Sequence, residues 1–439
     1  MKRVLILGAG LVAGPLVRYL LNVKGFEVTV ASRTVEKAVR LIGGATNGTG
    51  VALDVRDEKA LESLVAAHDL SVSLLPYTYH PTVARLCVTH RKPMVTTSYV
   101  KDAMRELDEP ARAANVILLN EIGVDPGIDH MSAMRVIDGI RASGGTLVSF
   151  TSNTGGLPAP EANDNPFGYK FSWAPRGVLL AGKNAARYLK DGKTVEIPGA
   201  NLFANRWPCA IAGFGDLEVY PNRDSLPYIE TYGVSTVRSM FRGTLRYPGW
   251  SDTMVRIVEL GLLDETERTD VASGTFAGLL GQLIGVDGSA TRENLAGFLG
   301  LATDAKPIGD LEWLGFLSDE PLPAGATCLL DVLAARMLSM MQYAPGERDM
   351  LVMQHEFTVE HADRSERVLS TLVDYGIPNG DSSMSRLVGL PAAIAARRIL
   401  QGEIEQVGVC VPTDRSIYDP ILDELAEMGV GFSETVEVF

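Results

Sequence analysis

Cysteine is scarce in this chain. Only four occur among its 439 residues, at Cys87, Cys209, Cys328 and Cys410, and they are widely spaced with no CxxC pair. Disulfide frameworks and zinc sites need clustered or paired cysteines, so these residues are predicted to be reduced core thiols. No apolar run reaches roughly 18 residues, the length that spans a bilayer. Together these absences favour a reducing, cytoplasmic setting without a membrane span.

Positive charge is also in deficit. The chain has 40 Lys and Arg against 54 Asp and Glu, which gives a net charge of -14. Such a surface repels phosphate backbones, so nucleic-acid binding is not expected. The apolar content of 46% is typical of a folded protein. At this length we expect two or three domains.

Metal-binding and hydrolytic motifs are missing as well. His355 and His361 lie in HEFTVEH, which lacks the HExxH spacing of zinc hydrolases, and the chain has no GxSxG or catalytic cysteine motif. At a period of two these histidines share one face of a strand. We therefore expect core or edge histidines and no metal site.

The first 123 residues alternate short β-rich runs with helical patterns. In DEKALESLVAAH (57–68), for example, apolar residues recur at helical spacing after an aspartate that can cap the first turn. This alternation predicts an α/β fold in which helices cover both faces of a parallel sheet. The predicted strands are residues 3–8, 27–32, 50–55, 70–76, 92–98 and 116–123.

After about residue 146 the pattern changes. The proline- and glycine-rich stretch TGGLPAPEANDNPFGYKFSW (154–173) predicts a structured functional loop, because loops this long are otherwise uncommon in compact domains. Residues of about 251–345 carry helical patterns. The alternating run 349–361 predicts a half-buried strand, and residues 407–432 predict a further strand, turn and helix.

A glycine turn, GAGLVAG, directly follows the first predicted strand. Gly8 allows a sharp turn, Gly10 lets the backbone approach a pyrophosphate, and Ala13 fills the third small position where helix and strand pack closely. Leu11 and Val12 lie between them, where backbone amides at the start of the next helix would face the phosphates. The motif therefore predicts a dinucleotide-binding site.

The end of the second predicted strand indicates which dinucleotide binds. An acidic residue there would bind the ribose 2'-hydroxyl of NAD(H), but this chain has Ser32, Arg33 and Thr34. A guanidinium and two hydroxyls suit a 2'-phosphate, so NADP(H) is the predicted cofactor. The alternative is that Arg33 is a solvated surface arginine.

The next two strand ends supply further candidate contacts for the cofactor. Asp54 and Val55 follow the third strand and are expected to flank the adenine, although a helix cap is an equally ordinary role for Asp54. Leu75 and Pro76 follow the fourth strand, where the nicotinamide end should lie, and are expected to contact it through their backbone.

Tyr99 and Asp125 are candidate substrate contacts. Both fall at strand ends, and in an open parallel sheet ligands bind beyond the carboxyl ends of the strands. The alternative for Tyr99 is half-buried packing, and for Asp125 it is the start of a proline turn. Asp129 is expected to cap the following helix, and His130, a second acid–base candidate, is assigned mainly a structural role.

Arginines are concentrated in two further motifs. Arg223 lies in YPNRDSLPYIETYG, and Arg242 and Arg246 lie in RGTLRYPGW, without the helical spacing of a solvated face. Because guanidinium groups bind carboxylates through two hydrogen bonds, these residues favour a substrate that carries carboxylates. The alternative is structural arginines bound to backbone carbonyls or internal acids.

These motifs resemble a known family. The chain is similar over most of its length to saccharopine reductase, the NADP-dependent, L-glutamate-forming saccharopine dehydrogenase. The long loop is far more specific to this family than the glycine turn. The motifs that carry the resemblance are NEIGVDPGIDH (120–130), GGLPAPEANDNPFGYKFSWAPRGVLLA (155–181), YPNRDSLPY (220–228), RGTLRYPGW (242–250) and YAPGERDMLVMQHEF (343–357).

The resemblance implies an activity and an architecture. The activity is NADPH-dependent condensation of L-glutamate with L-2-aminoadipate 6-semialdehyde to give saccharopine, or the reverse, in lysine metabolism. The architecture is a homodimer whose chains have three domains. They are a Rossmann domain of residues 1–123 and about 388–439, an α/β substrate-binding and dimerisation domain of about 124–250 and 346–387, and a helical domain of about 251–345.

The resemblance also implies roles for individual residues. Tyr99, Asp125 and Arg223 are expected to contact the substrate, with Gly156 and Leu157 nearby in the loop. Tyr99 and Asp125 are the candidate catalytic residues, and Asp125 acts as an acid or base only if burial or a negative substrate raises its pKa.

Two other functions compete with this one. A related imine reductase that makes a carboxylated polyamine, such as a carboxynorspermidine dehydrogenase, acts on a cationic substrate and would favour an acidic lining over arginines. A redox sensor that binds NADP(H) without turnover would not need the loop and arginine motifs. Because those motifs are present, the saccharopine-forming enzyme is the leading hypothesis.

Overall fold

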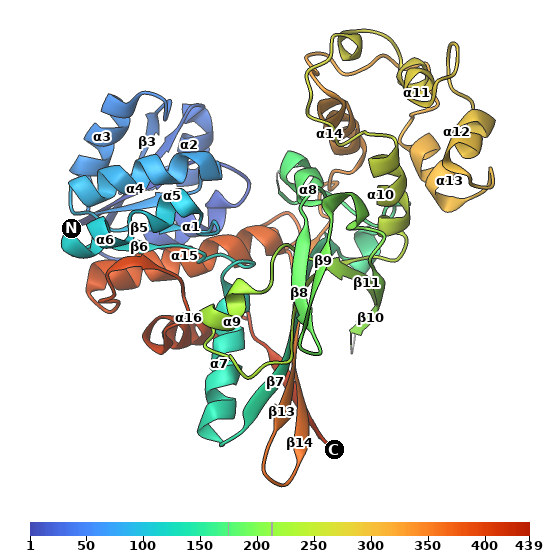
Figure 1. The fold of residues 1–439 in the computed structure, drawn as a ribbon. Coiled ribbons are helices and arrows are strands. Elements are labelled where there is room, and N and C mark those ends of the chain that lie inside the picture. Colours follow the sequence, from blue (N-terminus) through green and yellow to red (C-terminus); the bar gives the residue numbers. More distant parts are fainter. Residues whose placement is uncertain (174, 212–213) are drawn as a thin grey trace. The chain divides into compact units, whose positions relative to one another are not determined.

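The computed structural model describes residues 1–173, 175–211 and 214–439. These residues group into two units. The first consists of residues 1–146 and 380–433, and the second of residues 147–379 and 434–439. The chain therefore leaves the first unit after its N-terminal third and returns to it near the C-terminus (Figure 1).

The first unit is built on a seven-stranded parallel sheet. Its strand order is β15-β6-β5-β4-β1-β2-β3, and the part from β3 to β6 has the 3-2-1-4-5-6 order of Rossmann dinucleotide-binding folds. This order confirms the α/β fold class and the predicted N-terminal strands. The strands are β1 (Lys2–Leu7), β2 (Phe26–Ser32), β3 (Gly48–Ala52), β4 (Leu70–Ser73), β5 (Met94–Thr96), β6 (Ile117–Leu119) and β15 (Gly408–Cys410).

Helices and strands of this unit form where the sequence patterns place them. The side chains of Val4 to Leu7 in β1 are fully buried, as expected for a strand covered on both faces. The helix predicted in DEKALESLVAAH forms, and Asp57 caps it by accepting a hydrogen bond from the Ala60 amide. The helices are α1 (Ala13–Leu21), α2 (Val35–Ile42), α3 (Glu58–Ala67), α4 (His80–Thr89), α5 (Asp102–Arg105), α6 (Asp108–Ala113), α7 (Ile128–Ala142), α15 (Ser383–Gln401) and α16 (Arg415–Glu427).

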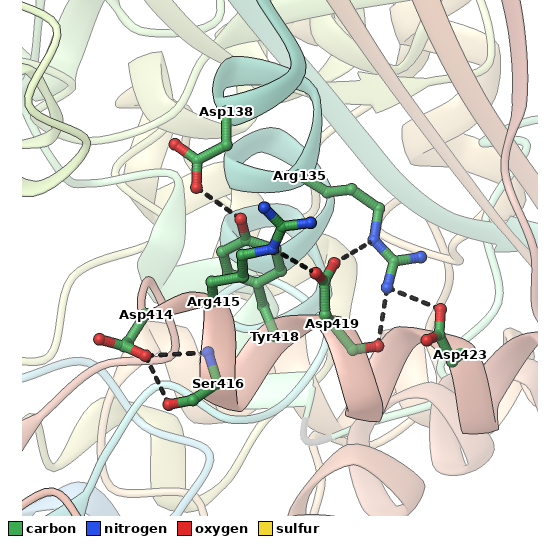
Figure 2. Close-up of polar contacts among 8 residues, drawn as sticks. All are labelled: Arg135, Asp138, Asp414, Arg415, Ser416, Tyr418, Asp419 and Asp423. Carbon is green, nitrogen blue, oxygen red and sulfur yellow. Dashed lines mark hydrogen bonds and ion pairs between the residues drawn. The ribbon is translucent and has the colours of Figure 1, made fainter. Parts of the chain in front are cut away.

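Helix α16 is fastened to helix α7 by polar side chains (Figure 2). Arg135 of α7 donates hydrogen bonds to the carboxylate and backbone oxygens of Asp419, at 2.8 and 2.7 Å, and to the Asp423 carboxylate at 2.8 Å. The buried Tyr418 donates its hydroxyl to Asp138 at 2.5 Å. Because α7 directly follows the loop after β6, the C-terminal helix fixes the direction in which that loop continues.

The second unit contains a mixed, nine-stranded sheet in the part of the chain that is described. Strands β7 and β12 pair in parallel, whereas β10, β11 and β12 form antiparallel neighbours, as do β13 and β14. Strand β13 confirms the strand predicted at 349–361. The strands are β7 (Thr146–Pro158), β8 (Ala186–Lys190), β9 (Lys193–Ile197), β10 (Trp207–Ile211), β11 (Gly215–Pro221), β12 (Ser239–Arg246), β13 (Asp349–Glu360), β14 (Ser365–Tyr375) and β16 (Ser433–Val438).

The last strand, β16, differs from the sequence-based expectation. The sequence predicts that residues of about 388–439 belong to the Rossmann domain, whereas residues 434–439 belong to the second unit and β16 lies beside β14. The Phe439 amide donates to the Ser365 carbonyl oxygen at 2.9 Å. The alternating segment SETVEV suits a strand, and the edge of a sheet offers backbone groups with which such a segment can pair.

The long loop after β7 is structured, as predicted. Phe167, Tyr169 and Phe171 are buried in the same apolar cluster as the helices that follow. Asn165 accepts a hydrogen bond from the Phe167 amide at 3.1 Å. The buried Lys170 forms ion pairs with two carboxylates. The loop is therefore held by its own aromatic side chains and polar contacts.

Helices dominate residues 250–340, in agreement with the helical patterns of the sequence. They pack into one apolar cluster within the second unit. Since the described residues separate into two units, the proposed three-domain division stays a prediction. The helices of this unit are α8 (Pro175–Ala181), α9 (Pro227–Thr231), α10 (Trp250–Glu259), α11 (Phe276–Ile284), α12 (Arg292–Leu299), α13 (Lys306–Trp313) and α14 (Leu329–Met340). Among the described residues, no helix has the length and apolar character needed to cross a membrane.

The contact between α7 and α16 yields a stability prediction. Replacing Tyr418 with Phe removes the hydrogen bond to the Asp138 carboxylate but keeps the buried ring. We expect Tyr418→Phe to lower the free energy of unfolding by about 1.5 kcal/mol, the lower end for hydrogen bonds to charged groups. Urea unfolding followed by circular dichroism measures the change. Tyr77→Phe, at an exposed ring, is the control, and equal effects of the two substitutions would refute the prediction.

Candidate functional site

The candidate residues of the first unit lie in turns that leave one edge of its sheet. Strands β1 to β6 are parallel, so their carboxyl ends meet at the same edge. Every candidate in this unit follows or ends one of these strands. They are Gly8, Gly10, Leu11 and Val12 at β1, Ser32, Arg33 and Thr34 at β2, Asp54 and Val55 at β3, Leu75 and Pro76 at β4, Tyr99 at β5, and Asp125 at β6.

The glycine turn has the geometry that a dinucleotide needs. Gly8 has a φ of 113°, and a Cβ atom there would lie 3.1 Å from the Leu74 backbone oxygen. A Cβ atom at Gly10 would meet nothing within 4 Å, so the backbone faces open space there. Leu11 is 71% exposed, while Ala13 is buried at the start of α1. The turn is therefore tight on the protein side and open on the side where a pyrophosphate would bind.

The end of β2 presents polar groups to solvent. Arg33 and Thr34 are exposed, and the Thr34 amide donates to the Ser32 hydroxyl oxygen at 3.3 Å. Arg33 also lies close enough to Asp54 to help lower the pKa of that carboxyl. A positive group at this position is suited to a phosphate on the adenosine ribose.

Arg56 is not among the candidate residues predicted from the sequence. Its Nε lies 3.0 and 3.1 Å from the two carboxylate oxygens of Asp54, and its Nη2 lies 2.5 Å from Oδ2. The Arg56 guanidinium is the main reason that the pKa of Asp54 falls to about 2. Asp54 therefore holds a second guanidinium near Arg33. The spacing in DVRD was the available signal, since a guanidinium two residues from a carboxylate can fold back onto it.

A buried histidine ties the fourth and fifth strand ends together. His80, the first residue of α4, is hydrogen-bonded through Nδ1 to the Ser73 hydroxyl at 2.9 Å and through Nε2 to the Ser98 hydroxyl at 2.8 Å. Thr96 lies 3.2 Å from Nε2 and also donates to the Ser73 carbonyl oxygen. Burial lowers the pKa of His80 to about 4. The ring is therefore neutral at physiological pH and connects the turn of Leu75 and Pro76 with the segment that carries Tyr99.

Tyr99 and Asp125 come together, although 26 positions separate them. The Tyr99 hydroxyl donates to the Asp125 carboxylate at 2.9 Å, and both side chains are partly buried. The peptide bond between Asp125 and Pro126 is cis. At Gly127 a Cβ atom would lie 2.1 Å from the Gly123 backbone oxygen, so only glycine fits there. The loop thus closes on itself and carries Asp125 toward the end of β5.

Three titratable residues contact this loop or follow it in the interior. The buried carboxylate of Glu121 lies 2.8 Å from Nε2 of His130, whose side chain is 0% exposed. The expectation that Asp129 caps α7 is wrong, because the helix begins one residue earlier: Gly127 is the N-cap, and Asp129 lies in the first turn, where it accepts a hydrogen bond from the Gly127 amide at 2.6 Å. Glu121 is not among the candidate residues predicted from the sequence. Its position, two residues past a buried strand and nine before a histidine, was the only signal.

The remaining candidates belong to the second unit. Gly156 is partly exposed in β7, whereas the Leu157 side chain is 0% exposed in an apolar cluster with Val219 and Leu245. Leu157 can therefore offer a ligand only its backbone. Arg223 follows β11, has a φ of 56°, and accepts a hydrogen bond from the Arg187 amide at its carbonyl oxygen.

The other two arginines of the motifs are buried rather than solvated. The Arg242 guanidinium lies 4.3 Å from the centre of the Tyr228 ring. That of Arg246 lies 4.9 Å from the Tyr169 ring and 5.4 Å from the Trp250 ring. Stacking of this kind stabilises a buried guanidinium and orders the aromatic cluster around it.

The histidines of HEFTVEH lie on β13 and directly after it. His355 is buried against the rings of Phe150 and Phe357, as expected for a core histidine. His361 lies 3.3 Å from the Glu366 carboxylate. Within residues 1–173, 175–211 and 214–439, no group of three His, Cys, Asp or Glu side chains has a metal-binding arrangement.

Comparison with known families gives two matches that together span most of the chain. A model described as Saccharopine dehydrogenase NADP binding domain matches residues 4–119. A model described as Saccharopine dehydrogenase C-terminal domain matches residues 123–430. The boundary between the two matches falls in the loop between β6 and α7.

Individual relatives match over nearly their whole length. Saccharopine dehydrogenase [NADP(+), L-glutamate-forming] of Schizosaccharomyces pombe is 42% identical, with 99% of each chain covered. The protein of the same description from Pyricularia oryzae is 42% identical, with 97% of each chain covered. The apo structure of saccharopine dehydrogenase (L-Glu forming) from Saccharomyces cerevisiae is 39% identical, covers 100% of both chains and has a TM-score of 0.91.

The buried His80 predicts how stability depends on pH. Its pKa is about 4 in the folded protein and 6.5 in the absence of the fold. Between these values only the unfolded chain binds the proton, so this contribution is fully present above pH 6.5 and is lost as the pH falls toward 4. The loss amounts to about 3 kcal/mol.

The measurement is urea unfolding between pH 8 and pH 4. We expect His80→Gln to unfold with a shallower pH dependence than the unsubstituted protein, whatever its stability at pH 8. Ser98→Ala serves as the control, since it removes one hydrogen-bond partner but keeps the imidazole and its pH dependence. Parallel curves for His80→Gln and the unsubstituted protein would contradict the assignment.

Proposed function

The chain belongs to the family of NADP-dependent, L-glutamate-forming saccharopine dehydrogenases, and we propose that the turns at the carboxyl edge of its first sheet carry out the family's reaction. The enzyme condenses L-glutamate with L-2-aminoadipate 6-semialdehyde and reduces the imine to saccharopine, or runs the reverse reaction. It is thus an oxidoreductase that acts on a CH–NH bond in lysine metabolism. Identity of 42% over nearly the full length of two fungal relatives carries this conclusion.

NADP(H) is the cofactor, as the matching NADP-binding family and the relatives agree. When bound, it supplies the hydride that reduces the imine carbon. We propose that the open backbone of Gly8, Gly10, Leu11 and Val12 binds the pyrophosphate. The exposed Arg33, with Ser32 and Thr34, then binds the 2'-phosphate. The exposure of the polar groups and the space beside Gly10 support this assignment.

The two remaining strand ends complete the proposed cofactor contacts. Asp54 and Val55 flank the adenine. The ion pair with Asp54 holds the positively charged guanidinium of Arg56 on that side. Leu75 and Pro76 contact the nicotinamide end through their backbone. The hydrogen bonds from His80 to Ser73 and Ser98 support this, because they hold the turn after β4 in place.

Tyr99 and Asp125 are the proposed catalytic residues. A carboxylate attracts the amino group of an amino acid, so Asp125 orients the glutamate amine, and the Tyr99 hydroxyl holds the carboxylate at 2.9 Å. As hydride reaches the imine carbon, the nitrogen must gain a proton. The linked hydroxyl and carboxylate are suited to deliver it or to relay it from water.

Gly156, Leu157 and Arg223 are proposed to bind substrate from the second unit. A guanidinium at Arg223 suits the carboxylates of glutamate and saccharopine. Leu157 would act through its backbone, since its side chain is buried. These roles rest on the family resemblance of the motifs that contain the residues.

The two competing functions are not favoured. A reductase of polyamine metabolism and an inactive NADP(H) sensor both differ from the function named for the relatives that match over the full chain.

We also propose a cytoplasmic, reducing setting, supported by the four cysteines, which form no disulfide. A homodimer, expected from the resemblance, is a further proposal that light scattering during gel filtration would test.

Glutamate dependence is the decisive test of the activity. With NADPH and L-2-aminoadipate 6-semialdehyde present, we expect oxidation of NADPH, followed at 340 nm, only when L-glutamate is added. A diamine in place of glutamate is the control for the polyamine reductase and should give no turnover. Absence of glutamate-dependent oxidation would refute the proposed function.

Arg33 should decide between the two nicotinamide cofactors. Arg33→Ala removes the charge-assisted bond to the 2'-phosphate, so we expect the Kd of NADPH to rise roughly 10- to 100-fold, as for loss of one hydrogen bond to a charged group. The Kd of NADH should hardly change, and fluorescence titration measures both. Arg40→Ala, at an exposed position in α2, is the matched control. Equal losses for NADPH and NADH would contradict the role of Arg33.

A further inference from the structure

Glu121 occupies an unusual position just after β6. Its side chain is only 7% exposed, and its backbone has a φ of 56°, in the left-handed region that residues other than glycine rarely adopt. Such a conformation is strained and persists where the surroundings determine it. The contacts of Glu121 therefore indicate what this conformation serves.

Glu121 holds the segment that contains Tyr99 at two points. Its backbone amide donates a hydrogen bond to the Ser98 carbonyl oxygen at 3.2 Å. Its side-chain oxygen Oε1 accepts a hydrogen bond from the Val100 amide at 2.8 Å. These two contacts lie immediately before and immediately after Tyr99, so one residue fixes both peptide groups next to the tyrosine.

His130 fixes the other end of the Glu121 carboxylate. Its Nε2 lies 2.8 Å from Oε2, and the imidazole is fully buried on α7. A carboxylate removed from water needs partners for its oxygens, because leaving them unsatisfied is expensive. With Oε1 on Val100 and Oε2 on His130, the carboxylate has one defined orientation.

The same segment has a second buried side chain that holds it. The Ser98 hydroxyl is hydrogen-bonded to the buried His80 at 2.8 Å. Tyr99 thus lies between two neighbours that are each held by a buried side chain. From this position its hydroxyl reaches the Asp125 carboxylate at 2.9 Å.

We propose that Glu121, oriented by His130, is a positioning residue that aligns the Tyr99 hydroxyl with Asp125 and the substrate. The proposal rests on the function assigned above to Tyr99 and Asp125. Glu121 does not itself contact substrate or cofactor in this proposal. It acts by limiting the rotation and displacement of the Tyr99 segment, and small displacements of a reacting group can lower rates by about 100-fold.

A purely structural role is the alternative. In that case Glu121 stabilises the fold and its loss would lower activity regardless of what stands at position 99. The two roles differ in their coupling, because residues that act through one another have non-additive effects whereas independent ones are additive.

A double-mutant cycle with Tyr99→Phe separates the two roles. We expect Glu121→Ala to lower kcat/KM for glutamate by about 100-fold in the unsubstituted protein, but to have little further effect once the Tyr99 hydroxyl is absent. Glu121→Gln keeps an oxygen that can accept from the Val100 amide, so it should recover much of the activity. The Kd of NADPH should stay unchanged in all variants. Equal losses from Glu121→Ala in both backgrounds would overturn the proposal.

Two further measurements keep the proposal testable. If Glu121→Ala does not fold, His130→Ala replaces it in the cycle, because it removes the bond that orients Oε2. The crystal structure of the folded variant gives a result that does not depend on turnover. A Tyr99 hydroxyl moved out of hydrogen-bond distance from Asp125 supports the proposal, and an unmoved one refutes it. An inactive unsubstituted protein would instead count against the proposed function.

Discussion

The parallel direction of the strands in the first sheet is the constraint on which the site depends. Because β1 to β6 all run the same way, six turns leave the same edge, and each can bring one or two side chains there. In the proposed assignment, the glycine turn and the Arg33 turn bind one end of the cofactor, and the turns of Tyr99 and Asp125 bind the substrate. The chemistry is thus divided among short segments that the sheet brings together.

Turns of this kind need support, since exposed loops do not hold side chains to a fraction of an ångström unaided. In this unit buried polar side chains provide that support. His80 connects β4 and β5 through two serine hydroxyls, and Glu121 connects β5 and β6 through the Val100 amide. Helix α7, on which His130 lies, is fixed in turn by Arg135 and the C-terminal helix. Residues outside these turns therefore contribute to the geometry of the candidate site.

The sequence predicted those parts that follow from local pattern. The alternation of β-rich and helical patterns predicted the strands and the fold class. The positions of Tyr99 and Asp125 at strand ends made them candidates. Their mutual hydrogen bond joins residues 26 positions apart, and periodicity has no information about such a pair. Glu121 was not predicted, because its proposed positioning role depends on a left-handed backbone conformation and on a buried partner on another element. The pairing of β16 was missed for a similar reason, since composition shows that a segment can form a strand but not which edge receives it.

The return of the chain to its first unit bears on biosynthesis. Strands β1 to β6 are synthesised early, but α15, β15 and α16 follow residues 147–379, which form most of the second unit. Helix α15 packs closely on α1, where a Cβ atom at Gly389 would lie 3.0 Å from the Val12 backbone oxygen. Until α15 arrives, the apolar surface that it covers stays open to solvent and to other nascent chains. The nucleotide-binding unit can therefore be completed only after residues 147–379 of the second unit have been synthesised.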